Sequence, residues 1–127
     1  CNNVIAVSAV GPTGTKASYS SYGPVVDVAA PGGSGFNPAA DNILSTYNLG
    51  LTTQGAEGYA WNAGTSMAAP HVAGIVALIQ SASTTPKTPA QVTKIIENTA
   101  YANGGFPGGC SYAVPSFFSI IDLLWYF

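Results

Sequence analysis

The stretch that decides the fold reads Gly64-Thr65-Ser66-Met67-Ala68-Ala69-Pro70-His71-Val72-Ala73-Gly74 and continues as Ile75-Val76-Ala77-Leu78-Ile79-Gln80. From Ser66 onward it is apolar on nearly every side of a helix, which is typical of a helix inside a large core. Pro70 fits because it falls in the first turn, where few amides have helical partners. A chain of 127 residues offers little to surround such a helix. We therefore expect a larger domain to complete it.

Ser66 occupies the position that an acyl-transfer nucleophile requires. It follows a Gly-Thr turn and opens the helix, so its hydroxyl lies at the positive end of the helix dipole. The oxyanion of a tetrahedral intermediate needs preorganised N–H donors, and the backbone N–H of Ser66 is one candidate. Judged by position alone, a serine at the start of a helix is most often only a cap.

The eleven residues from Gly64 to Gly74 resemble the nucleophile motif of the subtilase family almost letter for letter. Other segments resemble strands and turns of this family in the same order, and together the resemblance covers residues 3 to about 108. These segments are Asn3-Val4-Ile5-Ala6-Val7, Ala17-Ser18-Tyr19-Ser20-Ser21-Tyr22-Gly23, Val26-Asp27-Val28-Ala29-Ala30-Pro31-Gly32 and Ile43-Leu44-Ser45-Thr46. The resemblance implies an α/β fold, a three-layer sandwich with a mainly parallel sheet, of which this chain is the C-terminal portion.

The resemblance also implies hydrolysis of peptide bonds through a Ser–His–Asp triad, with Ser66 as the nucleophile. The family order is aspartate, histidine, serine, so the first two members would precede Cys1, as would the asparagine that completes the oxyanion hole. His71 lies five positions after Ser66 and points about 140° away on a helix. We expect His71 to be structural, and likewise Asp27, which lies in a strand motif.

We therefore expect a serine-type endopeptidase, present as a fragment that is inactive alone because an isolated hydroxyl without an adjacent base is a weak nucleophile. Its expected partners are peptide or protein substrates and the N-terminal part of the same domain. Alone, the chain should expose core surfaces, including an edge strand. The alternative is a catalytically inactive remnant or a binding or structural fragment.

An α/β-hydrolase esterase is disfavoured by the residues around Ser66. The nucleophile elbow of that class requires Gly-x-Ser-x-Gly, but the fifth residue here is Ala68. The segment Trp61-Asn62-Ala63-Gly64 is also a poor strand to lead into such an elbow.

Charge excludes other classes of function. Only 6% of residues are charged, and the chain has three Lys and Arg residues with a net charge of -2. Such a chain cannot neutralise a row of phosphates, and it has no basic cluster for a membrane surface, so we expect neither partner. We expect no cofactor and no metal site, because Asp27, Asp41 and Glu57 lack the spacing of a calcium loop. The family resemblance allows structural calcium in the parent protein.

Short apolar runs predict strands over residues 4–10, 25–30 and 43–46, the second of them stopped by Pro31. Turn residues Gly55 and Gly58 predict a hairpin-like excursion over residues 51–62. A second helix is predicted after Thr88, because Thr88 can cap it, Pro89 suits its first position, and Gln91 completes a capping box. The aromatic residues of these loops could line a substrate groove, but are more often partly buried anchors; they are Tyr19, Tyr22, Tyr47, Tyr59 and Trp61.

The two ends of the chain carry the remaining expectations. We divide it into residues 1–108, the subtilase-like portion, and residues 109–127, a divergent apolar tail. We interpret residues 111–127 as a frameshift or read-through product; the alternative is a natural helix or strand that docks on the domain. Cys1 and Cys110 are two unpaired thiols, one bridge, or two cysteines whose own partners are missing. All three states are compatible with the secreted, extracellular location that we expect.

Overall fold

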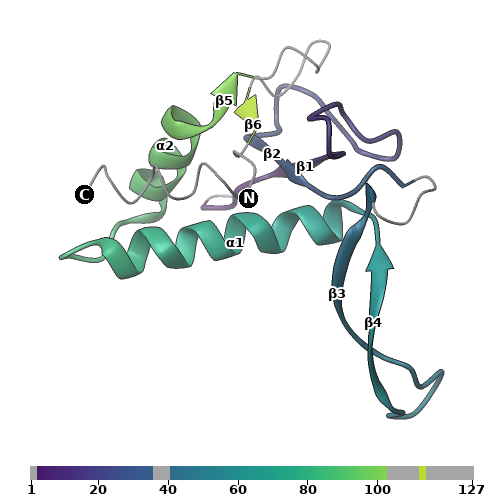
Figure 1. Ribbon diagram of the computed structural model, residues 1–127. Coiled ribbons are helices and arrows are strands. Elements are labelled where there is room, and N and C mark those ends of the chain that lie inside the picture. Colours follow the sequence, from purple (N-terminus) through teal and green to yellow (C-terminus); the bar gives the residue numbers. More distant parts are fainter. Residues whose placement is uncertain (1–2, 36–40, 103–111, 114–127) are drawn as a thin grey trace.

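The computed structural model describes residues 3–35, 41–102 and 112–113. These residues form a sheet with helices packed against it, and a separate hairpin that projects away from both (Figure 1). Cys1, Cys110 and residues 114–127 lie outside the described residues, so the interpretations of the cysteines and of the tail stay predictions.

The main sheet has the order β1-β2-β6-β5. Strand β1 (Val7–Val10) runs parallel to β2 (Val28–Pro31), and β6 (Tyr112–Ala113) runs parallel to β2 on its other side. Strand β5 (Tyr101–Ala102) is antiparallel to β6. The described part of the sheet is therefore mainly parallel, and together with its helices it gives the predicted α/β class.

The strands differ from the sequence prediction at their ends. Residues 4–6 and 25–27 precede β1 and β2 instead of joining them, and Pro31, expected to stop the second strand, is its last residue. Proline has no N–H to donate, so it can end a strand but not continue its ladder. Strand β6 lies within the segment set apart as a divergent tail, so the sheet includes Tyr112 and Ala113 from beyond residue 108.

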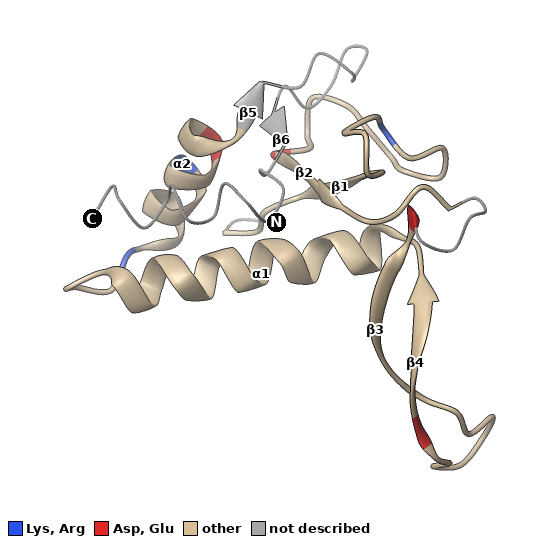
Figure 2. Ribbon diagram, in the orientation of Figure 1, with Lys and Arg blue, Asp and Glu red and all other residues tan. Residues whose placement is uncertain are grey.

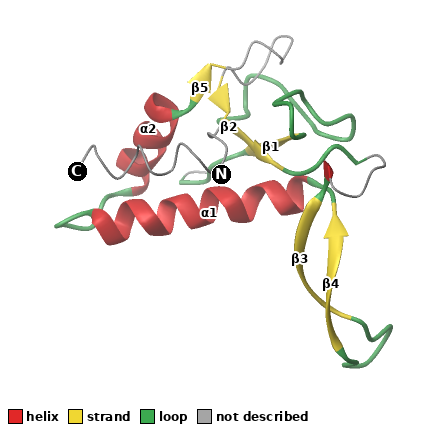
Figure 3. Ribbon diagram, viewed as in Figure 1, coloured by secondary structure: helices red, strands yellow, loops and turns green. Residues whose placement is uncertain are grey.

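Helix α1 (Thr65–Ala82) packs against β1 and β2, and α2 (Pro89–Thr99) packs beside it on the same core (Figure 3). The core draws on both helices and on the strands: Ala9, Ala17, Val28, Ala30, Ala68, Val72, Ile75, Ile79, Val92 and Ile96. Alternate strand residues Val10 and Ala29 belong to a second small cluster, to which no described helix contributes. One helical layer on one sheet is thus described.

Helix α1 has an inner side and an outer side. Its buried residues are Ala68, Val72, Ile75 and Ile79, spaced to face the sheet. The residues between them are exposed although they too are apolar or small: Ala69, Pro70, Ala73, Gly74, Ala77 and Leu78, the last with 44% of its surface exposed. No described residue buries this outer side.

The edge of β1 is covered at its centre by the chain's own loop. The Ala9 N–H donates to the Ser20 hydroxyl at 2.8 Å, and the Ala9 carbonyl accepts from the Ala17 N–H at 3.0 Å. The segment after the Gly11–Gly14 turn therefore takes the place of a neighbouring strand at this point. Among the described residues, the large apolar side chains that are exposed lie mainly within residues 44–61, and Leu78 is the one on α1.

Helix α2 begins as its sequence predicts. The Thr88 hydroxyl accepts from the Gln91 N–H at 3.4 Å, and the Gln91 side chain accepts from the Thr88 N–H at 2.9 Å. Pro89 is the first helical residue, so the capping box and the proline position are both confirmed. No helix among the described residues combines the length and the apolar character needed to cross a bilayer.

The hairpin consists of β3 (Ile43–Asn48) and β4 (Glu57–Asn62), paired antiparallel from Ile43 opposite Asn62 to Asn48 opposite Glu57. It forms its own two-stranded sheet and projects beyond the N-terminal end of α1 (Figure 1). A hairpin is present, but it begins earlier than the predicted excursion over residues 51–62, because the strand predicted over residues 43–46 forms its first arm; Gly58, expected in a turn, lies inside β4.

Candidate active site

The candidate site lies where the hairpin leads into α1. Strand β4 ends at Asn62, and α1 begins three residues later, with Gly64 as its N-cap. The judgement that residues 61–64 make a poor strand is therefore wrong for its first half, because β4 is regular up to Asn62. The remaining argument against the α/β-hydrolase class is Ala68, because the nucleophile elbow of that class needs glycine at this position.

The first turn of α1 has no side-chain cap and no acidic residue. The Gly64 carbonyl accepts the N–H groups of Met67 at 3.0 Å and of Ala68 at 3.3 Å. Ser66 lies in the same turn and is exposed. Because the first N–H groups of a helix lack helical acceptors, this turn presents partial positive charge beside the Ser66 hydroxyl.

A hydrogen bond ties the turn before Ser66 to the end of β2. The Gly64 N–H donates to the Gly32 carbonyl at 2.9 Å. Gly32 has no room for a side chain, because an added Cβ would lie 2.6 Å from the Ala9 Cβ and 2.7 Å from the Gly64 carbonyl oxygen. Only glycine therefore permits the close approach of these two backbone segments.

Tyr19 holds the same junction from a third segment. Its hydroxyl lies 2.7 Å from the Gly32 carbonyl oxygen and 2.6 Å from that of Gly33, and its single proton can serve one of them at a time. Burial of the hydroxyl end raises the pKa of Tyr19 above its usual 10.0, and a hydrogen bond with the Gly64 backbone opposes that rise. The ring remains partly exposed while its polar end is anchored.

The other two candidate polar side chains are held away from Ser66. The Nδ1 atom of His71 lies 2.8 Å from the Met67 carbonyl oxygen, one turn back on the same helix. The Asp27 carboxylate accepts from the Ala6 N–H at 2.7 Å and joins the residues that precede β1 and β2. Both contacts agree with structural roles. Among the described residues, no group of three or more acidic, histidine or cysteine side chains could hold a metal ion.

The aromatic residues divide into two sets. Tyr19 is the anchor that the sequence reasoning favoured, and Tyr22 is an exposed ring whose centroid lies 5.1 Å from the Lys16 Nζ. Tyr47, Tyr59 and Trp61 are exposed on the hairpin, so the anchor interpretation is wrong for them. The link between Tyr19, Gly32 and Gly64 is absent from the sequence prediction, and its one signal in the sequence is the Pro-Gly-Gly run that begins with the last residue of β2.

Comparison with known proteins places this geometry in a family. The model of the subtilase family matches residues 1–113. The extracellular protease of Xanthomonas campestris pv. campestris is 53% identical over 111 residues, which cover 87% of this chain and 17% of that protein. Thermitase of Thermoactinomyces vulgaris is 40% identical over 99 residues, covering 78% of this chain and 29% of thermitase.

Comparison with solved structures leads to the same family as the sequence matches. A protease structure from Pseudoalteromonas arctica superposes with a TM-score of 0.80 at 40% identity, over 96% of this chain and 36% of that one. The chain thus spans less than a third of the two relatives named above and about a third of the solved structure. The extent of these matches leads to one conclusion: the chain belongs to the subtilase family.

Proposed function

We propose that this chain is the nucleophile-bearing part of a secreted serine endopeptidase, with Ser66 as the nucleophile and the Ser66 N–H as an oxyanion donor. One observation carries the proposal: Ser66 is exposed on a helix turn that no side chain caps. That turn offers N–H donors to a developing oxyanion, and the links from Gly32 and Tyr19 fix its position.

The catalytic aspartate and histidine then come from another part of the same domain. Within the described residues, His71 and Asp27 are engaged elsewhere. The outer side of α1 supports this division, since its small apolar residues suit close packing against a further layer. A three-layer sandwich, completed by that other part, is the architecture that we propose for the whole domain.

Substrate and location follow from the same assignment. The relatives are named as proteases, two of them as extracellular proteases, and this supports peptide or protein substrates and a secreted location. The chemistry requires no cofactor, because the serine, a base and an oxyanion hole suffice for acyl transfer. Structural calcium in the complete protein remains compatible with this proposal.

A fluorophosphonate probe tests the proposal, because it labels a serine only when the hydroxyl is activated. We expect labelling of Ser66 in the complete catalytic domain and none in the 127-residue chain, which lacks an adjacent base. Ser66→Ala in the complete domain should abolish labelling and lower kcat by about 10⁶-fold, the loss typical of subtilisin when its nucleophile is removed.

Ser81→Ala is the matched control. Ser81 is also exposed on α1, but its hydroxyl donates to the Leu78 carbonyl at 2.9 Å, far along the helix from Ser66. This variant should label and hydrolyse normally. A complete domain that reacts at a serine other than Ser66 would refute the site. A domain with no labelling at all would support the alternative, a binding or structural protein.

A further inference from the structure

The hairpin presents an exposed row of side chains that the proposed chemistry at Ser66 does not use. Cross-strand pairs on one face are Leu44 with Trp61, Thr46 with Tyr59, and Asn48 with Glu57; we call these six residues the outer face of the hairpin. Tyr59 exposes 73% of its surface, Leu44 50% and Trp61 47%. Large apolar side chains gathered on an exposed face mark an interaction surface more often than isolated ones do.

The outer face changes in character along its length. The Leu44–Trp61 pair lies nearest the body of the molecule, and the Asn48–Glu57 pair lies at the far end. Glu57 is the first residue of β4 at that far end, whereas Asp41 lies two residues before β3, at the opposite end of the hairpin; acidic residues are red in Figure 2. A ligand lying along this face therefore meets apolar surface first and a negative charge last.

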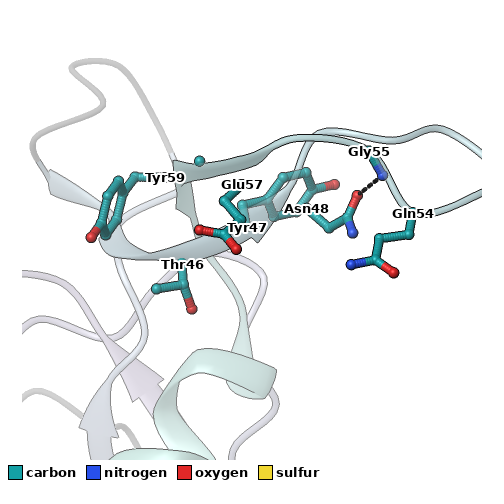
Figure 4. A pocket seen from close by; sticks show the side chains of 8 residues that line it. Thr46, Tyr47, Asn48, Gln54, Gly55, Glu57 and Tyr59 are labelled. Carbon is teal, nitrogen blue, oxygen red and sulfur yellow. Dashed lines mark hydrogen bonds between the residues drawn. The ribbon is translucent and has the colours of Figure 1, made fainter.

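A hollow of about 540 Å³ surrounds that charge at the far end of the hairpin. Its walls include Tyr47, Asn48, Gln54, Glu57 and Tyr59, which Figure 4 shows in a row along the hairpin. Asn48 fixes one wall, because its side-chain oxygen accepts from the Gly50 N–H at 2.8 Å and from the Gly55 N–H at 3.0 Å. Among the described residues, no cation pairs with the Glu57 carboxylate.

These features suit a basic side chain. A carboxylate on the same face as the Tyr59 ring attracts a Lys or Arg side chain both by charge and through the π face. The hollow is wide enough for the long aliphatic stem of such a residue, and Gln54 adds a polar wall. Lysine and arginine are scarce in this chain, so a second copy is a poor source of the cation.

We propose that the outer face of the hairpin binds an extended polypeptide substrate, with an apolar residue against Leu44 and Trp61 and a Lys or Arg in the Glu57 hollow. This inference rests on the proposed endopeptidase function. It follows from continuity, because β4 leads through residues 63–65 directly to Ser66, so one polypeptide can lie across both. From Trp61 to Glu57 an extended chain advances about 13 Å, or roughly four residues, at 3.3 Å per residue.

Fluorescence anisotropy of labelled peptides on the chain itself tests this binding without any need for catalysis. The reference peptide carries one leucine and, four positions away, one lysine. Moving the lysine by one position turns it to the opposite side of an extended peptide and should weaken binding about threefold to fivefold, as expected for an exposed ion pair. Tyr59→Ala should weaken binding of the reference peptide about tenfold, since it removes a ring contact.

Glu57→Gln should weaken the reference peptide about threefold to fivefold and abolish the preference for lysine position. Asp41→Asn is the matched control: it makes the same change of charge two residues before β3, at the other end of the hairpin, and should leave binding unchanged. If both variants lost the same peptide affinity, the effect would come from overall charge, and this result would overturn the proposal. So would equal affinity for every lysine position, or self-association of the chain that Tyr59→Ala abolishes while peptides fail to bind.

Kinetics of the complete catalytic domain separate this inference from the proposed function. Lysine at the matching position should lower KM without changing kcat, and Glu57→Gln should remove that advantage. If peptides are cleaved with the same KM whatever the position of the lysine, the endopeptidase assignment stands and the proposed binding site is overturned. Binding that depends on Glu57, without cleavage of any peptide, refutes the endopeptidase while the hairpin site stands.

Discussion

The two helices reach the same conformation by different means. Helix α2 is specified locally: it has a capping box, a proline at its first position, and one buried stripe that includes Val92 and Ile96. Helix α1 has no side-chain cap and is apolar on both its inner and outer sides. Helix α2 is therefore stabilised largely by its own residues, whereas α1 depends on the segments that pack against it.

This difference bears on function. A helix that relies on its own capping side chains has its first N–H groups already engaged, as Thr88 engages Gln91 in α2. Helix α1 keeps its first turn free of such a cap, and Ser66 lies in that turn. In α1, stability comes from burial along the helix, and the proposed function assigns its uncapped N-terminal N–H groups to the oxyanion. The comparison yields three experiments, in order of decreasing effect.

The largest effect is expected from a charge on the outer side of α1. Ala73→Glu should cost the isolated chain only about 0.5 kcal/mol, because the position is exposed there. In the complete catalytic domain the same change should cost more than about 3 kcal/mol or prevent folding, since an unpaired charge would be buried. Urea denaturation of both proteins measures the contrast.

Ala90→Glu is the matched control on α2. Ala90 is exposed in the first turn, where a negative charge is favourable to the helix dipole. It should be neutral or slightly stabilising in both the chain and the complete domain. If Ala73→Glu were tolerated as well as Ala90→Glu in the complete domain, the outer side of α1 would not be covered, and the proposed division of the domain would be wrong.

A smaller but still large effect is expected on the inner side of α1. Ile75 is only 5% exposed and belongs to the core shared with both helices. Ile75→Ala should lower the free energy of unfolding by about 2–5 kcal/mol, through lost burial and the cavity left behind. The control Leu78→Ala, on the outer side, should cost the chain less than about 1 kcal/mol. Similar losses in the two variants would contradict the two-sided description of α1.

The smallest effect is expected at the cap of α2. Thr88→Ala removes the acceptor for the Gln91 N–H and should cost about 1 kcal/mol by chemical denaturation. Thr88→Ser keeps the hydroxyl and should retain most of the stability. A neutral Thr88→Ala would mean that α2, like α1, is stabilised by packing alone, and the contrast between the helices would disappear.

The sequence alone predicted those elements whose signals are local. The capping box of α2 could be predicted from Thr88, Pro89 and Gln91, and the apolar run predicted α1 to within two residues of its ends. The strand ends were less accurate, because residues before β1 and β2 continue the apolar pattern without joining the ladder. Hydrophobic patterning predicts burial, and hydrogen-bond register depends on neighbours far away in sequence.

The surroundings of Ser66 could not be predicted in the same way. Its motif identifies the residue, but the link between Tyr19, Gly32 and Gly64 joins three segments that meet only in the folded chain. No spacing of residues in the sequence predicts such a contact. The outer face of the hairpin could not be predicted either. The strand register decides which aromatic residues share a face, and it pairs Thr46 with Tyr59 and Leu44 with Trp61.

Gly32 also limits how this sequence can drift over evolutionary time. Any other residue there would collide with Ala9 on one side and with the Gly64 backbone on the other. Ala9 could make room only by becoming glycine, and the Gly64 carbonyl could make room only by shifting the turn that carries Ser66. No single substitution of Gly32 is therefore expected to be neutral. A lineage that replaces Gly32 shifts the turn that carries Ser66 in the same step.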